Sequence, residues 1–125
     1  MNTIIWIAQA LLAAFMLAAG LAKLTRTKEQ LVGSDSTAWT EDFSPQQIKG
    51  IGTLEVTAAI GLIVPALIDV VPVLVAVAAS GVVLLMVGAG VTHVRRGEAQ
   101  KLPVNIVVAA LALFIAIERF GPHAF

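Results

Sequence analysis

The stretch from Ser44 to Pro65 decides the fold: Ser-Pro-Gln-Gln-Ile-Lys-Gly-Ile-Gly-Thr-Leu-Glu-Val-Thr-Ala-Ala-Ile-Gly-Leu-Ile-Val-Pro. It begins as a helix does, because Ser44 can cap the first turn, Pro45 suits the first helical position and Gln47 completes a capping box. A single charged residue, Glu55, interrupts the apolar run that follows. The stretch therefore predicts an apolar helix that carries one carboxylate.

The length of this apolar run points to a membrane. The eighteen residues from Ile51 to Ile68 contain only Glu55 as a charge, and as a helix they rise about 27 Å, close to the thickness of a bilayer core. A carboxylate inside a bilayer needs a cationic partner, a proton or water. The other helices are therefore best understood as the surroundings of Glu55.

The composition supports this interpretation. Hydrophobic residues make up 58% of the 125 residues and charged residues only 13%, whereas soluble domains have about 25% charged residues. The formal net charge is zero, so no basic field indicates a nucleic-acid partner. The chain has no cysteine, which excludes thiol–disulfide chemistry and thiolate-ligated clusters.

Three further apolar runs complete a transmembrane architecture. The first, from Ile4 to Ala22, contains Gln9 as its only polar residue, and we expect a true span rather than a signal peptide because it is long and no basic residue precedes it. We predict an all-α, up-down-up-down four-helix bundle in which residues 1–125 form one transmembrane domain. The predicted spans are about 4–22, 50–68, 73–93 and 103–120, and residues 24–44 are predicted as a loop.

Small and polar residues recur on one face of each span, as expected where helices pack in a membrane. In the third span the small residues are expected to let backbones approach: Ala76, Ser80, Gly81, Gly88 and Gly90. Near the end of the fourth span, Glu118 and Arg119 are expected to snorkel to the interface or to pair there. In the long loop, Trp39 and Phe43 are expected to anchor at the interface.

The distribution of Lys and Arg predicts the orientation. The side of the first and third loops carries seven such residues, and the opposite side carries only Arg119. The positive-inside rule then makes the seven-charge side cytoplasmic and places both termini outside, in the cell membrane. The seven residues are Lys23, Arg26, Lys28, Lys49, Arg95, Arg96 and Lys101.

Each span brings one notable polar residue to the same side of the membrane. Lys23 ends the first span, Glu55 lies in the second, His93 ends the third and Asn105 begins the fourth. Antiparallel spans in this order place all four residues at a similar depth. They are candidate ligand-binding residues of a polar pocket in the cytoplasmic half. The alternative is purely structural, with Lys23 and Glu55 as an ion pair and the other two side chains as hydrogen-bonded glue.

Other chemistry finds little support. Bis-histidine haem ligation fails because His93 and His123 lie near opposite ends of the bundle. A metal site with several nitrogen or carboxylate ligands is equally hard to assemble, and no glycine-rich nucleotide motif is present. We therefore predict no metal site and no catalytic residues, and we expect no activity of the chain on its own.

The whole chain resembles the DoxX-like family of small four-span membrane proteins. The resemblance rests on Ala-Gly-Leu-Ala-Lys-Leu at 19–24, Ile-Lys-Gly-Ile-Gly-Thr-Leu-Glu-Val at 48–56, Gly-Leu-Ile-Val-Pro at 61–65, the stretch Gly-Ala-Gly-Val-Thr-His-Val-Arg-Arg-Gly-Glu at 88–98, and Asn105. The family is named for a link to a subunit of a thiosulfate:quinone oxidoreductase. The resemblance thus implies a fold and a membrane site more firmly than a reaction.

Two functions follow as hypotheses. The first is an accessory bundle that binds a small apolar ligand or a partner, with the polar pocket as its site and no cofactor. The second is the membrane subunit of a quinone-linked oxidoreductase, with a quinone as cofactor and a partner redox protein as the source of electrons. Both place the chain in the lipid bilayer, both exclude nucleic acid, and the sequence assigns no oligomeric state.

Overall fold

Four long helices account for most of the chain. The computed structural model describes residues 2–124, apart from the side chains at positions 35 and 36, and contains no strand in that part. The prediction of an all-α fold with four apolar helices is confirmed. The long helices are α1 (Asn2–Thr25), α3 (Pro45–Leu67), α4 (Leu74–Arg95) and α5 (Leu102–Phe120), and the short ones are α2 (Lys28–Val32), η1 (Asp35–Asp42) and η2 (Ala99–Lys101).

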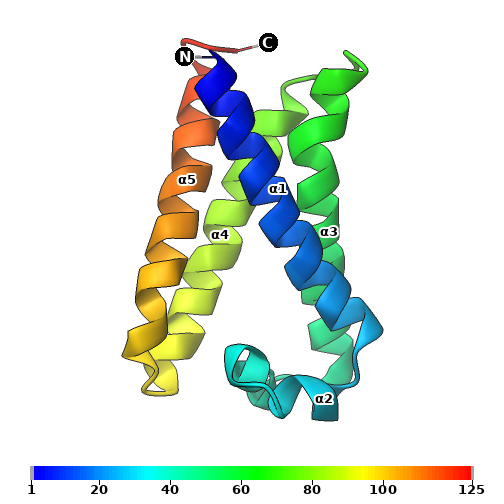
Figure 1. Cartoon of the computed structure of the whole chain (residues 1–125), viewed down its shortest axis with the longest axis vertical. Coiled ribbons are helices and arrows are strands. Elements are labelled where there is room, and N and C mark those ends of the chain that lie inside the picture. Colours follow the sequence, from blue (N-terminus) through cyan, green and yellow to red (C-terminus); the bar gives the residue numbers. More distant parts are fainter. Residues whose placement is uncertain (1, 125) are drawn as a thin grey trace.

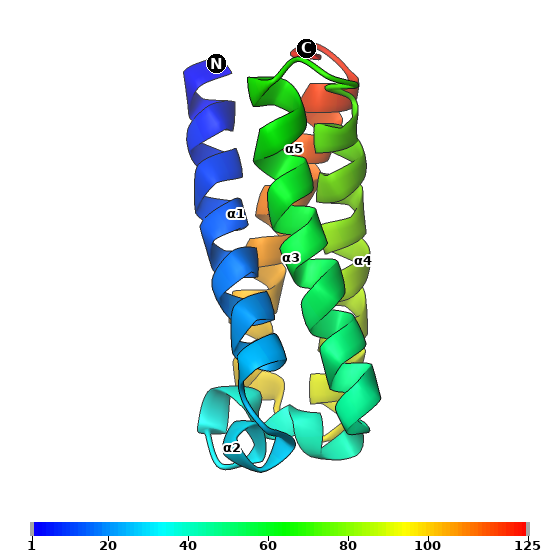
Figure 2. The ribbon, with the colours of Figure 1, turned by 90° about the vertical axis from the view of Figure 1, so that its right-hand side faces the viewer.

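The four long helices alternate in direction (Figure 1). Both termini lie at one end of the bundle, called here the termini end, and α2, η1 and η2 lie at the other, called the loop end. Helix α1 packs along α3, and α4 packs along α5 (Figures 1 and 2). Helices α1 and α5 approach each other at the termini end and diverge toward the loop end, so the two helix pairs form a wedge.

The start of α3 is the capping box that the sequence predicts. The Ser44 hydroxyl accepts from the backbone N–H of Gln47 at 3.1 Å, and the Gln47 side chain accepts from the backbone N–H of Ser44 at 2.9 Å. Pro45 occupies the first turn, where its missing N–H costs nothing. Local sequence therefore sets where this helix begins.

Glycines bring α1 and α3 into close contact. A Cβ at Gly20 would lie 2.8 Å from the carbonyl oxygen of Gly52 and 2.7 Å from Cγ2 of Val56. A Cβ at Gly52 would lie 3.0 Å from the carbonyl oxygen of Gly20. Only a hydrogen fits at these two positions, so the backbones pack directly, as small residues permit between membrane helices.

Lys49 of α3 also forms hydrogen bonds to the end of α1. Its ammonium donates to the carbonyl oxygens of Leu24 at 2.7 Å and of Lys23 at 3.2 Å. These carbonyls belong to the last turn of α1, which leaves its final acceptors without intrahelical partners. A cation from α3 therefore caps α1, where the helix dipole also favours positive charge.

The outer faces of the helices suit a lipid environment. Each of the four long helical stretches is apolar enough and long enough to cross a membrane. Large apolar side chains face outward along them, among them Leu84, Val107 and Ile60. A soluble monomer rarely exposes so continuous an apolar surface, whereas lipid tails cover it at no cost.

The small residues of the third span do not all do what we predicted. Gly81 and Gly88 face open space, with nothing within 4 Å of a built Cβ. A close approach between α3 and α4 occurs instead at Gly61, where a Cβ would lie 2.9 Å from that of Ala78. Small residues allow a close approach, but which of them meets a neighbour depends on how the helix is rotated.

Of the two alternatives predicted for Glu118 and Arg119, snorkelling or pairing, the structure shows pairing: Glu118 lies 2.6 Å from the His123 ring, and Arg119 binds neighbours inside the bundle. Its side chain is buried at the termini end, where it donates to the Gln9 side chain at 2.8 Å, to Asn2 at 2.7 Å and to the carbonyl of His123 at 2.9 Å. Gln9 in turn donates to the carbonyl of Leu62 at 2.7 Å. This polar network joins α1, α3 and α5 where the wedge is closed, and its hydrogen bonds satisfy groups that lipid cannot.

The segment 24–44 is more ordered than the loop we predicted. Thr27 and Gln30 form a second capping box that starts α2, and η1 follows after Gly33. Trp39 and Phe43 pack edge to face with their ring centroids 5.5 Å apart. Rather than only bridging two spans, the segment closes the open side of the wedge at the loop end (Figure 1).

Candidate functional site

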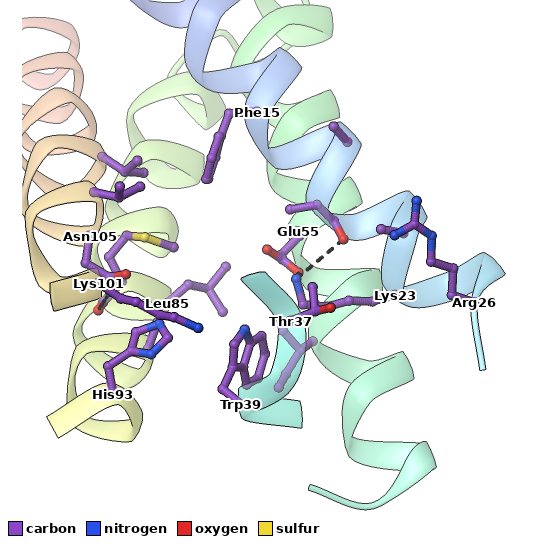
Figure 3. Close-up of a pocket in the computed structure, with 18 of the residues that line it drawn as sticks. Phe15, Lys23, Arg26, Thr37, Trp39, Glu55, Leu85, His93, Lys101 and Asn105 are labelled. Carbon is purple, nitrogen blue, oxygen red and sulfur yellow. Dashed lines mark hydrogen bonds and ion pairs between the residues drawn. The ribbon is translucent and has the colours of Figure 1, made fainter. Parts of the chain in front are cut away.

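A cavity lies between the two helix pairs at the loop end. It has a volume of about 600 Å³, and both helix pairs and η1 contribute residues to it. Most of its wall is apolar, with Phe15 from α1, Leu85 and Met86 from α4 and Val108 from α5. The wedge shape explains the cavity, because the helix pairs separate where η1 is inserted. We call it the loop-end cavity (Figure 3).

One wall of the loop-end cavity carries a buried ion pair. The Lys23 ammonium of α1 lies 2.8 Å from Oε1 of Glu55 of α3, and each residue is only 5% exposed. Apart from the Lys23 ammonium, no donor in the described part of the chain reaches Glu55 Oε1. Helical spacing aims both side chains inward, from the faces that hold Gly20 and Gly52.

Trp39 of η1 covers this ion pair. The Lys23 ammonium lies 5.3 Å from the centroid of the Trp39 ring, within the range of a cation–π interaction. Figure 3 shows the indole facing the ends of the Lys23 and Glu55 side chains across the cavity. The ammonium is thus held between a carboxylate and an aromatic face.

The opposite wall carries His93 and Asn105. His93 Nδ1 lies 3.0 Å from Oε1 of Glu98, and Asn105 donates from Nδ2 to the carbonyl of Met86 at 3.0 Å. Glu98 also lies 3.3 Å from Nε of Arg96 and 3.7 Å from the ammonium of Lys101. The hydrogen bond from His93 is the largest cause that lowers the pKa of Glu98, so this carboxyl is ionised near neutral pH.

The comparison with protein families identifies the family of the chain. The model of the DoxX-like family matches residues 7–115. The chain belongs to the DoxX-like family. Neither the comparison with curated proteins nor the comparison with solved structures gives a match. With four apolar helices and this family, the protein is a multi-pass membrane protein.

The four polar residues predicted for this DoxX-like protein line one cavity. Lys23, Glu55, His93 and Asn105 all line the loop-end cavity, and all lie within the matched segment. They divide into two walls, with the ion pair on α1 and α3 and the other two side chains on α4 and α5. The cavity separates these walls, so in this structure the four residues do not form one hydrogen-bonded cluster.

The sequence analysis missed two residues of the site. Trp39 was assigned to the interface because it stands in a polar segment, and only the path of η1 brings it over Lys23. Glu98 was left in a polar loop, although it follows His93 by five residues and supplies the partner of its ring. The turn after α4, with Gly97 at φ +69°, brings Glu98 back to the histidine, because glycine adopts this conformation readily.

The side chains that the structure describes, which leave out those at positions 35 and 36, form no evident metal centre. Among them, no group of three or more His, Asp or Glu side chains is placed to hold a metal ion. His93 and His123 each pair with one glutamate, at opposite ends of the bundle. What the loop-end cavity provides is an ion pair, a histidine held by a carboxylate, an amide and an aromatic face.

The lowered pKa of Glu98 predicts acid sensitivity at the loop end. A carboxyl with a depressed folded-state pKa contributes stability above its unfolded pKa of about 4.3, and this contribution disappears as pH falls through the folded value. We therefore expect the thermal midpoint in detergent to fall between pH 6 and pH 3 by less in Glu98→Gln than in the parent protein. Glu29→Gln, an exposed site on α2, is the control and should follow the parent. Identical curves for Glu98→Gln and the parent would contradict the prediction.

Proposed function

We propose that this DoxX-like protein is a non-catalytic membrane bundle that holds a small, largely apolar ligand by its polar end in the loop-end cavity. One observation carries the proposal: polar side chains from all four long helices line a single cavity whose remaining wall is mostly apolar. Ligand sites in proteins have this character, with volumes of about 300–1,000 Å³ and a few convergent polar groups. The cavity volume of about 600 Å³ lies within that range.

A purely structural role explains this arrangement less well. Polar residues that only stabilise the packing of membrane helices form hydrogen bonds directly across the helix interface, as Gln9 and Arg119 do at the termini end. At the loop end, the polar groups of the two helix pairs are separated by space. The Lys23–Glu55 pair stabilises α1 against α3, but its position on a cavity wall also makes it available to a ligand.

Filling the cavity provides the test. In Ala89→Phe, a ring is added at an α4 residue that lines the cavity. We expect this variant to lose the small molecule that the parent protein carries through gentle extraction, as measured by native mass spectrometry. Ala110→Phe adds the same ring on an exposed α5 position outside the cavity and should retain the ligand. Equal ligand content in the two variants would contradict the proposal.

The membrane subunit of a quinone-linked oxidoreductase is the second candidate. What favours it is the presence of a protonatable side chain on each wall, Glu55 on one and His93 on the other, with Glu98 bound to the His93 ring from outside the lining. Such groups could exchange protons with a quinone, while a partner protein supplied the electrons. A quinone that co-purifies with the parent protein and is lost in Glu55→Gln would support this function, and its absence from gently extracted protein would count against it.

We also propose that the loop end faces the cytoplasm of a cell membrane, on the basis of the positive-inside rule. The native chain has no cysteine, so an introduced cysteine is the only residue that a thiol reagent can label. In intact cells, an impermeant thiol reagent should label Ala124→Cys at the termini end and leave Gln46→Cys at the loop end unlabelled, while both react after lysis. The reverse pattern would invert the orientation and place the cavity in the outer leaflet.

A further inference from the structure

We infer that the polar end of the ligand is an uncharged group that carries hydroxyl hydrogens, and that it enters from the bilayer between α1 and α5. This inference rests on the proposed function and names the class of ligand. It follows from three observations: the buried charges around the cavity are already paired, the polar groups left without partners are mainly acceptors, and the cavity opens on an apolar seam.

The charges near the cavity compensate one another. Lys23 pairs with Glu55 at 2.8 Å, while Glu98 lies within 4 Å of cationic atoms of Arg96 and Lys101. The remaining cation on the lining, Arg26, is exposed and can be solvated at the rim. An ionic head group would need an opposite charge that is not already engaged, because a charge out of water is costly without a partner. A neutral head group has no such requirement.

Glu55 is the first acceptor with remaining capacity. Its carboxylate is buried, and in the described part of the chain its only polar contact is the ion pair that Oε1 forms with the Lys23 ammonium at 2.8 Å. An ionised carboxylate can only accept, with about four lone-pair sites. A ligand hydroxyl would therefore find a charge-assisted partner here, which is a stronger hydrogen bond than one between neutral groups.

His93 and Asn105 are the acceptors on the opposite wall. Since ionised Glu98 can only accept, Nδ1 of His93 carries a proton, and in the neutral form of the ring Nε2 is the acceptor. Likewise, the Met86 carbonyl can only accept, so the amide nitrogen of Asn105 faces it and Oδ1 is the atom that remains. Neither Nε2 nor Oδ1 has a partner in the described part of the chain.

The donors around the cavity also suit a hydroxyl. Trp39 lines the cavity, and its indole N–H has no hydrogen-bond partner within residues 2–124. A hydroxyl group both donates and accepts, whereas an ether or a carbonyl only accepts. A head group with two hydroxyls could donate to both walls and still accept from the indole, which no acceptor-only group can do.

The route of entry lies along the seam between α1 and α5. Phe15 of α1 and Val104 of α5 both line the cavity and remain 44% and 59% exposed. These two helices touch mainly at the termini end, through Gln9 and Arg119, and diverge toward the loop end (Figure 1). The opening is thus apolar and faces lipid, as suits a ligand that arrives dissolved in the bilayer.

Tryptophan fluorescence can test this inference. The chain has two tryptophans, and Trp6→Phe leaves Trp39, in the cavity wall, as the single reporter. In phosphatidylcholine nanodiscs we would titrate this variant with 1-O-decylglycerol and with its dimethyl ether. We expect the diol to bind at least about tenfold tighter, because the ether leaves buried acceptors unpaired. Decylhydroquinone and its dimethyl ether form a second matched pair, which distinguishes an aromatic diol from an alkyl diol as the source of the hydroxyls.

Matched variants locate the effect. His93→Phe and Asn105→Leu, each in the Trp6→Phe background, should each reduce the preference for the diol about tenfold. His123→Phe removes the histidine of the other His–Glu pair, at the termini end, and should leave the preference unchanged. If one cavity variant fails to fold, the other still tests the inference.

The failures of the two proposals are distinguishable. Equal binding of diol and ether, or tighter binding of decyl phosphate or decyltrimethylammonium, would overturn the hydroxyl inference and leave the cavity as a ligand site. If none of these amphiphiles binds, and Ala89→Phe carries the same small molecules as the parent, the proposed function fails as well.

Discussion

Replacing Lys23 by methionine will destabilise the bundle by about 3–5 kcal/mol, because it leaves the carboxylate of Glu55 buried without its partner. The two side chains meet at 2.8 Å with 6% of each exposed, so water cannot substitute for the lost cation. The same change removes the ammonium that lies under the Trp39 ring, which loosens η1. The thermal midpoint and the unfolding free energy in one fixed detergent measure the effect.

A double-mutant cycle separates the pair from its surroundings. Glu55→Gln removes the charge and keeps the shape, and Lys23→Met combined with Glu55→Gln should cost less than the sum of the single changes. Residues in direct contact show coupling of about 0.5–3 kcal/mol. Strict additivity would show that the two side chains do not interact, contrary to the geometry described above.

Replacing Gly20 by valine will separate α1 from α3 and destabilise the protein by about 1–3 kcal/mol or more, as overpacking does in close-packed interiors. Even a Cβ at this position would lie 2.8 Å from the backbone oxygen of Gly52, and backbone cannot move aside as the end of a flexible side chain can. The Lys23–Glu55 pair spans the same two helices three residues further along, so its geometry should be lost as well. Unfolding in detergent and loss of the cavity ligand would both report the change.

Gly81 provides the control for this prediction. It lies within α4 and nothing stands within 4 Å of a built Cβ, so Gly81→Ala meets open space. Alanine is favoured over glycine in a helix interior by about 0.5–1 kcal/mol. We expect Gly81→Ala to be neutral or stabilising, and a loss as large as that of Gly20→Val would mean that glycine substitution itself, rather than close packing, is responsible.

Much of the fold could be predicted because its causes are local. The capping boxes, the length of each apolar run and the breaks at Pro72 and Pro103 depend on neighbours within a few residues. The buried face of α1 was also predictable, since Gln9, Met16 and Lys23 follow the helical period and are all buried. The limits of such reasoning appear at Gly81 and Gly88, which are small but have no neighbour within 4 Å of a built Cβ.

The candidate site could be predicted in part, through depth along the helix axis. Alternating helices of similar length place the ends of α1 and α4 and the start of α5 at one level, and so Lys23, His93 and Asn105 at a common end. Depth, however, does not determine distance across the bundle. The Lys23–Glu55 ion pair was one of two alternatives in the sequence analysis, whereas nothing in the periodicity indicated that His93 turns to Glu98 on the other wall.

By itself the sequence determined the four apolar helices, their caps and the end of the bundle at which the polar residues gather, because a helix's rise and period translate spacing directly into depth and face. Only the tertiary structure decided that the helix pairs diverge at the loop end and that Trp39 covers the ion pair. It also decided that Lys49 caps α1 and that Arg119 is buried beside Gln9. These contacts join residues that are 16 to 110 positions apart, so they depend on how closely Gly20 and Gly52 let α1 and α3 pack and on the path of η1 between the helix pairs. No local pattern encodes either quantity, and together they create the cavity.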